Sequence, residues 1–122
     1  MRSLAATIAV SALLVVAGAA GAAAPPPFPN LAGDWSHAEI NVKIKGQPHT
    51  LVLDRGRVIL AGPRRIAIRE QGSPTPVIVN MTVGTIVMIN GVRANRRLLA
   101  HGMTVETMGI DGGPAVRVRA TF

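Results

Sequence analysis

Apolar and polar residues alternate along short stretches of this chain from residue 34 onward. In residues 40–45 the apolar side chains are Ile40, Val42 and Ile44, and every residue between them is polar. A period of two is typical of a half-buried β-strand, because successive side chains point to opposite faces. Comparable runs of extended character follow at residues 50–54, 57–61, 65–69, 77–81, 85–89, 103–108 and 115–121.

Turn-forming residues separate these runs. Asn90-Gly91 and Asp111-Gly112 are pairs favoured in tight hairpin turns, and residues 46–48 indicate another turn. Residues 95–100 are the one stretch that predicts a helical turn. About eight short strands in this arrangement predict an all-β fold, either a barrel or a sandwich. We favour a small antiparallel barrel, because closure hides the strand edges of a chain rich in Val and Ile.

The first 24 residues have the three-part pattern of a secretory signal peptide. Arg2 gives a positive start, residues 4–16 are apolar apart from Ser and Thr, and residues 17–24 are all Ala or Gly. Signal peptidase accepts small residues before the bond that it cuts, so we expect cleavage after Ala22 or Ala23. An uncleaved membrane anchor is the alternative, which the Ala/Gly-rich end of the segment disfavours.

The chain contains no cysteine. A lipoprotein needs a lipid-bearing cysteine, so we expect none here, and disulfides and thiolate metal sites are excluded as well. We predict export by the Sec route to the periplasm, the cell wall or the medium. Residues 25–33 are rich in proline and predict an extended or disordered spacer, and residues 34–122 have the length of a single domain.

Charge and aromatic content narrow the choice of partner. Without residues 1–24, twelve basic residues, ten of them Arg, outnumber six acidic ones. This excess suits a polyanion partner, although GC-rich coding produces the same bias. The aromatic residues that follow residue 24 are Phe28, Trp35 and Phe122. Single-stranded nucleic acid is usually held by bases stacked on several rings, so a nucleic-acid partner is disfavoured.

Four arginines make the most suggestive polar set. Each occupies an outward position of an alternating strand, two in residues 65–69 and two in residues 115–121. If these strands are neighbours, their basic stripes merge into a surface for an anionic polymer or for lipid headgroups. A solvated barrel exterior is the alternative interpretation. The residues of this predicted anion-binding surface are Arg65, Arg69, Arg117 and Arg119.

His37 and Glu39 are two residues apart in a predicted strand and therefore share a face. With His49 or His101 folded nearby, they are candidates for a zinc or iron site of two histidines and one carboxylate. Solvated polar residues at the start of a strand explain the same pattern, and we expect no bound cofactor.

No motif predicts catalysis. The region after the leader contains only Ser36 and Ser73 as serines, and it has neither cysteine nor a Gly-x-Ser-x-Gly elbow. Among the acids, Asp111 is explained by its turn. Asp54, beside Arg55 and Arg57, indicates an ion-paired strand end.

A set of turns and core positions recurs from Gly56 to Phe122. Gly56 opens a strand, residues 85–91 end in an Asn-Gly turn, a leucine pair at 98–99 precedes Gly102 and Val105, and an alanine-containing strand closes the chain. In these features the chain resembles a widespread domain of unknown function from exported bacterial proteins. The resemblance implies a small open β-barrel of the oligonucleotide/oligosaccharide-binding (OB) type, and it implies no catalytic residue.

From these observations we predict a non-catalytic envelope or secreted module that contacts a partner through its basic surface. The partner is a protein, an anionic polymer or a membrane surface. A small ligand- or metal-binding barrel is the alternative, and an enzyme is the third hypothesis.

Overall fold

β-Strands form the regular structure of this chain, together with one short 3₁₀ turn, in the residues that a computed structural model describes, 7–16 and 24–122. The strands are, in chain order, β1 (Thr7–Val16), β2 (His37–Ile44), β3 (Gln47–Ala61), β4 (Arg65–Arg69), β5 (Val77–Ile89), β6 (Val92–Ala94), β7 (Thr104–Ile110) and β8 (Ala115–Thr121); the 3₁₀ turn η1 (Arg96–Leu98) lies between β6 and β7.

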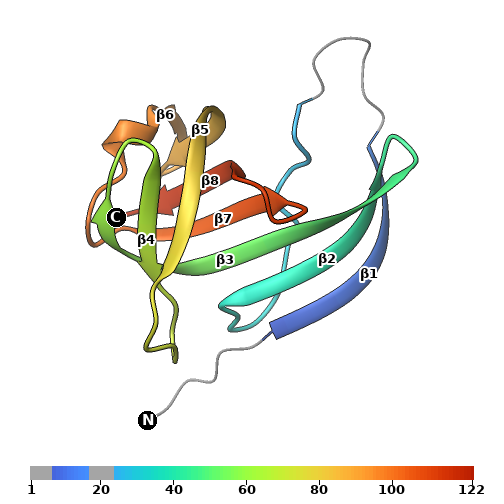
Figure 1. Cartoon of the computed structure of the whole chain (residues 1–122), viewed down its shortest axis with the longest axis horizontal. Coiled ribbons are helices and arrows are strands. Elements are labelled where there is room, and N and C mark those ends of the chain that lie inside the picture. The colour runs from blue at the N-terminus through green and yellow to red at the C-terminus, as the bar shows by residue number, and fades with distance from the viewer. Residues whose placement is uncertain (1–6, 17–23) are drawn as a thin grey trace.

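Five of these strands close into a barrel (Figure 1). The pairing order is β3, β4, β5, β8 and β7, and β7 returns to pair with β3. The contact between β5 and β8 is parallel, whereas the other four are antiparallel. The all-β fold and the small barrel expected from the sequence are confirmed, although the barrel is closed rather than open. The parallel pair was not foreseen, and it is possible because the chain passes through β6, η1 and β7 before it returns along β5.

Two further strands extend the sheet beyond the barrel. β2 pairs with the first half of β3, and β1 pairs in parallel with β2. β1 lies within the segment predicted to be a signal peptide, whereas the two expected cleavage positions, after Ala22 and Ala23, fall outside the described residues. Cleavage and export stay predictions. The described part of the chain has no helix with the length and apolarity that a bilayer crossing needs.

β3 is one strand of 15 residues where the sequence predicted two. Leu51 and Leu53 are buried on one face of this strand, and Val58 is buried on the other. The strand therefore contributes to two cores in turn, and its apolar positions change face near Gly56. β5 likewise joins two of the predicted strands into a single element of 13 residues.

The two cores lie on opposite faces of the β3–β7 part of the sheet. The barrel core contains Val58, Ile66, Ile68, Val79, Met81, Val87, Leu99, Met103, Val105, Ala115, Val118 and Ala120. The second core contains Trp35, Ala38, Ile40, Val42, Leu51, Leu53 and Met108. Complete burial of Leu and Met side chains contributes roughly 1.5–3 kcal/mol each to folding, so the second core is a substantial part of the fold.

Residues 25–35, which we call the strap, cover the second core. Phe28 and Leu31 pack against this core, Trp35 belongs to it, and Pro26 is buried. The proline-rich segment predicted as an extended or disordered spacer thus lies against the sheet. The apolar contacts of Phe28, Leu31 and Trp35 hold this segment in place. The sequence pattern did not indicate that these residues belong to a core.

The hairpin turns have the backbone that their sequences favour. Asn90 and Gly91 have φ of 50° and 80°, and Asp111 and Gly112 have φ of 54° and 77°. Both pairs were predicted. The first hairpin turns at Lys45 and Gly46 rather than at residues 46–48, with φ of 52° and 78°. Two consecutive positive φ values are the requirement of a type I′ turn. The helical turn expected at residues 95–100 is also present, as η1.

Candidate functional site

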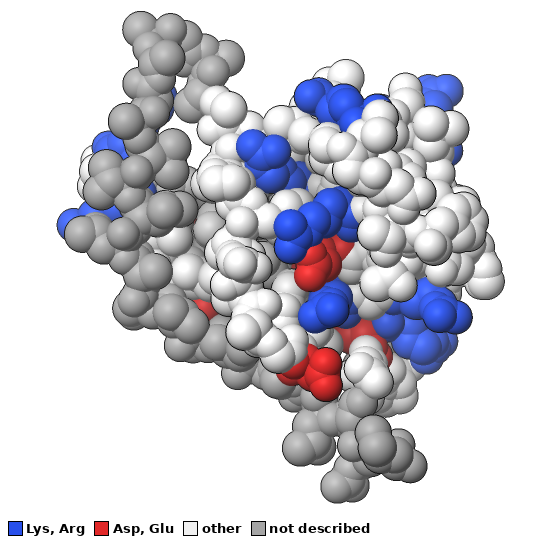
Figure 2. Space-filling model, turned by 180° about the vertical axis from the view of Figure 1, so that it is seen from behind, with Lys and Arg blue, Asp and Glu red and all other residues white. Residues whose placement is uncertain are grey.

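Two hollows that share lining residues form a groove between the strap and the barrel wall. One hollow, of about 580 Å³, is lined by Phe28 and by β5, β7 and β8. The other, of about 870 Å³, is lined by Trp35, the middle of β3 and the loop after β4. Arg55 and Thr104 line both. Basic side chains gather on this side of the molecule with acidic ones among them (Figure 2). The arginines of the groove are Arg55, Arg57, Arg69, Arg117 and Arg119.

Three charged side chains form a row across β3, β7 and β8. Arg55 lies opposite Glu106, and Glu106 lies opposite Arg119. Arg119 Nε donates a hydrogen bond to Glu106 Oε1, and Arg55 Nε is 3.7 Å from Glu106 Oε2. One carboxylate thus positions two guanidinium groups, and the row keeps one net positive charge.

Arg57 of β3 and Arg69 of β4 lie directly opposite each other, and both are exposed. Like charges in this arrangement destabilise a strand pair. Among the residues that the structure describes, neither guanidinium forms an ion pair, and Arg69 makes only a long hydrogen bond, 3.4 Å, to the Pro74 carbonyl. An anion between these two side chains would offset their repulsion.

Arg117 fastens the strap to the barrel. Its Nε and Nη2 atoms donate hydrogen bonds to the carbonyl oxygens of Pro26 and Pro25, at 2.7 and 2.8 Å. Hydrogen bonds from a charged donor are stronger than neutral ones. This arginine is therefore a structural part of the groove wall, with less of its donor capacity left for a ligand than Arg57 or Arg69.

Two aromatic rings line the groove, and an arginine covers each of them. The guanidinium carbon of Arg55 is 5.5 Å from the centre of the Trp35 ring, and that of Arg119 is 4.5 Å from the centre of the Phe28 ring. Both distances are within the range of cation–π attraction. The rings hold the arginines in place, and one face of each ring is taken.

The structure brings three of the four predicted arginines, Arg69, Arg117 and Arg119, into the groove. Arg65 is exposed on β4 but does not line the groove. β5 separates β4 from β8, so the two basic stripes do not merge by direct pairing of their strands. Their connection comes instead from Arg55 of β3, which lines both hollows.

Sequence reasoning missed Arg55 and Arg57 because it assigned them to an ion-paired strand end with Asp54. Alternation along β3 places Asp54 and Arg55 on opposite faces. Arg55 pairs with Glu106 in the groove, whereas the carboxylate of Asp54 contacts His37 on the other side of the sheet.

A separate basic group lies beside β6 and η1. Arg93, Arg96 and Arg97 line a hollow of about 400 Å³ beside β6 and η1. This group shares no lining residue with the groove. It therefore provides an internal comparison for the role of the groove arginines.

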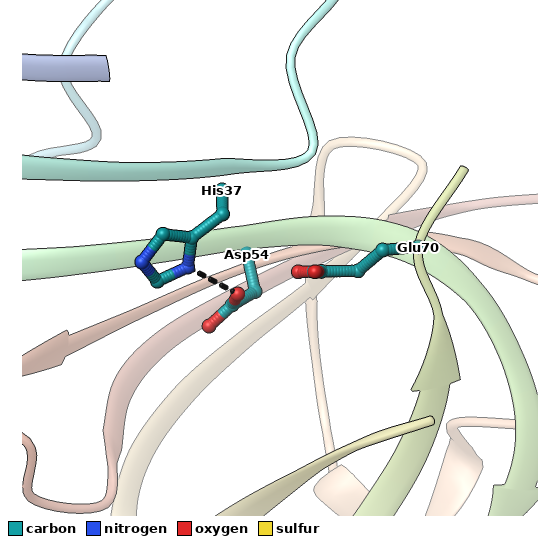
Figure 3. Close-up of side chains that lie close together, drawn as sticks. All are labelled: His37, Asp54 and Glu70. Carbon is teal, nitrogen blue, oxygen red and sulfur yellow. Dashed lines mark hydrogen bonds and ion pairs between the residues drawn. The ribbon is translucent and has the colours of Figure 1, made fainter. Parts of the chain in front are cut away.

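His37, Asp54 and Glu70 converge on the face of the sheet opposite to the groove row (Figure 3). His37 begins β2 and lies opposite Asp54 of β3, and Glu70 follows the last residue of β4. His37 Nδ1 is 2.7 Å from Asp54 Oδ1, and His37 Nε2 is 3.1 Å from Glu39 Oε2. One ligand atom from each of the three converging residues lies within 4.8 Å of the other two.

Burial gives this cluster unusual acid–base properties. Glu70 is 7% exposed, and its Oε2 atom has no hydrogen-bond partner among the described residues. Burial, followed by the neighbouring carboxyl of Asp54, raises the pKa of Glu70 to about 8. Burial acts to lower the pKa of His37, but its hydrogen bonds to Asp54 and Glu39 outweigh this, so the net shift is upward. At neutral pH the Glu70 carboxyl is therefore largely protonated.

Of the predicted metal ligands, the structure brings only His37 and Glu39 together. His49 contacts Asp111, with Nδ1 2.6 Å from Oδ2, and His101 is exposed in the turn before β7. Neither belongs to the cluster. The residues that complete the group, Asp54 and Glu70, were missed, because the first depends on the register of a hairpin and the second on the closure of the barrel.

No protein-family model, no curated protein and no solved structure matches this chain. The resemblance of residues 56–122 to a domain of exported bacterial proteins therefore stays a prediction.

Proposed function

We propose that this domain is a non-catalytic binding module that holds an extended anionic polymer in the groove between the strap and the barrel. The opposed pair of Arg57 and Arg69 carries the proposal. The two arginines are paired across neighbouring strands, and no carboxylate of the described residues forms an ion pair with either of them. Guanidinium groups present paired donors that fit carboxylate, phosphate or sulfate groups.

The shape of the groove favours a chain over a small anion. Its two hollows follow one another over the outside of the barrel and are joined at Arg55. A single small anion would fill one part of this length, whereas a polymer with regularly spaced charges contacts both parts at once. Linking several weak contacts in one ligand raises the overall affinity.

The electrostatics of the groove point the same way. Five arginines line the groove, against the acidic residues Asp34, Glu70 and Glu106. The five arginines outnumber these three acidic residues, so the lining keeps a positive excess. Field lines concentrate in a concave, basic surface of this kind and attract an anionic partner.

A polymer also fits better than the other anionic partners. A flat membrane surface reaches the rim of a concave groove but not its floor. Nucleic acid needs free ring faces for base stacking, and arginines cover Trp35 and Phe28. The predicted export supports the proposal, because it would place the domain among the anionic polymers of a bacterial envelope.

A heparin oligosaccharide is a suitable probe, since it is a linear chain of sugars that carry sulfate and carboxylate groups. We expect the double variant Arg57→Gln, Arg69→Gln to bind heparin at least about tenfold more weakly, and its affinity to depend less steeply on salt, because fewer counterions are released. The matched control is Arg96→Gln, Arg97→Gln, which removes the same charge outside the groove and keeps the affinity.

Two results would overturn the proposal. One is equal binding by the groove variant and the unchanged protein. The other is an equal loss of affinity in both double variants, which would show that net charge alone drives the interaction. Vesicles of anionic phospholipid at the same charge concentration form a second arm, and tighter binding to vesicles than to heparin would reassign the partner to a membrane.

A further inference from the structure

Three side chains from three different segments present metal-binding atoms to one another on the face of the sheet away from the groove row. His37 comes from β2, Asp54 from β3 and Glu70 from the residue after β4. The segments are distant in the sequence, so the barrel and its extension must both form before the cluster exists. Figure 3 shows the carboxyl group of Glu70 pointing toward Asp54.

The Glu70 side chain is buried with one carboxyl oxygen unpaired among the described residues. It is more than nine-tenths buried, and the unpaired oxygen is Oε2. Leaving a buried polar atom unpaired costs roughly 1–3 kcal/mol. The unpaired atom belongs to a side chain that is directed at a second carboxylate, an arrangement that a bound cation would satisfy.

Glu39 provides the support that a metal-binding histidine needs. A histidine that coordinates a metal through one ring nitrogen usually donates the N–H of the other to a carboxylate, which fixes the tautomer and the orientation of the ring. His37 Nε2 is 3.1 Å from Glu39 Oε2. With the Nε2 proton donated to Glu39, a neutral imidazole keeps its lone pair on Nδ1, the nitrogen 2.7 Å from Asp54 Oδ1, and a bound cation would replace this direct contact.

We propose that His37 Nδ1, Asp54 and Glu70 bind a single zinc ion, with Glu39 as the positioning residue for the imidazole. Zinc accepts one nitrogen and two carboxylate oxygens in tetrahedral geometry and leaves the fourth position to water. The imidazole favours zinc over magnesium and calcium, which prefer all-oxygen sites.

The site differs from the one that the sequence predicted. The sequence pattern suggested two histidines and Glu39 as direct ligands, whereas the structure supplies one histidine and two other carboxylates and moves Glu39 to a supporting position. It shares one residue, Glu70, with the lining of the groove, but the opposed arginines that carry the proposed polymer binding take no part in it.

Zinc titration of the metal-stripped protein, purified after expression of the full chain, tests the proposal. We expect isothermal calorimetry to give one zinc per chain. Glu70→Gln keeps the shape of the side chain and removes its charge, and we expect it to bind zinc at least about tenfold more weakly. His37→Gln removes the only nitrogen ligand and should abolish the one-to-one binding.

The matched control is His49→Gln. His49 is also a half-buried histidine in contact with an aspartate, at 2.6 Å, but among the described residues no third metal-ligating side chain joins this pair. We expect this variant to bind zinc as the unchanged protein does. Cobalt substitution adds a spectroscopic readout, because tetrahedral Co²⁺ with one nitrogen and several oxygen ligands has visible absorption bands that His37→Gln should remove.

Several outcomes would overturn the zinc proposal. These are the absence of stoichiometric zinc binding, unchanged binding in both Glu70→Gln and His37→Gln, or tighter binding of magnesium than of zinc. If His37→Gln fails to fold by circular dichroism, Glu70→Gln decides alone, because an isosteric neutral side chain leaves the packing intact. Loss of zinc binding would leave heparin binding unchanged, so the two proposals fail separately.

Discussion

At Gly56 the backbone of β3 passes close to the end of β4. A Cβ atom at this position would overlap the carbonyl oxygen of Arg69 and would lie 2.8 Å from its carbonyl carbon and 3.2 Å from the Glu70 nitrogen. All three are backbone atoms, so no side-chain rotation relieves the overlap. We predict that Gly56→Ala forces β3 and β4 apart at this point.

The cost can be worked out from the contact. Overpacking a well-packed site usually costs about 1–3 kcal/mol, and a backbone obstacle places Gly56→Ala at or above the upper end, about 3 kcal/mol. A small domain has a total stability of roughly 5–15 kcal/mol. Urea unfolding, followed by the fluorescence of the buried Trp35, should therefore show a clearly lower transition midpoint.

Gly84→Ala is the matched control. A Cβ on Gly84 would have Thr82 Oγ1 as its nearest neighbour, at 3.6 Å, which is an ordinary contact. The same change in residue type should leave stability within about 1 kcal/mol or raise it slightly, because alanine restricts the unfolded chain. A Gly56→Ala protein as stable as Gly84→Ala would refute the close approach of β3 and β4.

Three further predictions concern two buried side chains, Glu70 and Thr85, and Arg117, which holds the strap against the barrel. The pKa of Glu70 is about 8 in the folded protein, whereas in the unfolded chain it lies near the ordinary value of a glutamate. The folded state therefore keeps this proton to a higher pH, and in EDTA the free energy of unfolding should fall as the pH rises between the two pKa values. After a discount for solvent screening, Glu70→Gln should remove about 2 kcal/mol of this fall, measured by urea unfolding. The pKa of His37 is also raised, so this residue contributes a fall in the same direction that remains in the variant. An unchanged pH profile in Glu70→Gln would count against the burial of Glu70. Thr85 Oγ1 donates a 2.6 Å hydrogen bond to the carbonyl of Ala115, so Thr85→Val should cost about 1–3 kcal/mol in thermal or urea unfolding, and a neutral effect would mean that this carbonyl finds another partner. Arg117→Gln should loosen the strap, seen as faster amide hydrogen exchange in residues 25–35 with slow exchange kept in the barrel; equal protection of the strap in both proteins would contradict its attachment by this arginine.

Alternation along the chain was sufficient to predict the strands that serve one core. β2 alternates strictly between buried and accessible positions, and in β4 both isoleucines are buried between exposed arginines, as expected. β8 departs in part: Val118 and Ala120 face the barrel core, whereas Val116 packs against the second core beside a register irregularity. β3 was divided in two, because a strand whose apolar positions change face resembles two strands in a single sequence.

The candidate sites depend on contacts that a sequence pattern does not contain. A turn at Lys45 and Gly46 sets His37 opposite Asp54, whereas the predicted turn at residues 46–48 shifts the register and hides this pair. The correct turn would have revealed it. Glu70 reaches the cluster only through the closure of the barrel, which joins segments without any local signal.

The basic groove was also predicted only in part, because some of its arginines are evident from a single strand and others only from the way distant strands pair. Arg69, Arg117 and Arg119 were recognised from their outward positions on single strands. Arg57 becomes a candidate binding residue only because Arg69 lies opposite it across a strand pair. The groove as a whole depends on where the strap crosses the barrel. Neither feature is encoded in the spacing of neighbouring residues.

Chemical-shift mapping of the heparin-bound protein tests the polymer-binding groove most directly. Backbone and guanidinium signals of Arg55, Arg57 and Arg69 should shift together as heparin is added, and those of Arg93, Arg96 and Arg97 should stay in place. Shifts confined to the β6–η1 end, or spread evenly over all the arginines, would contradict binding in the groove.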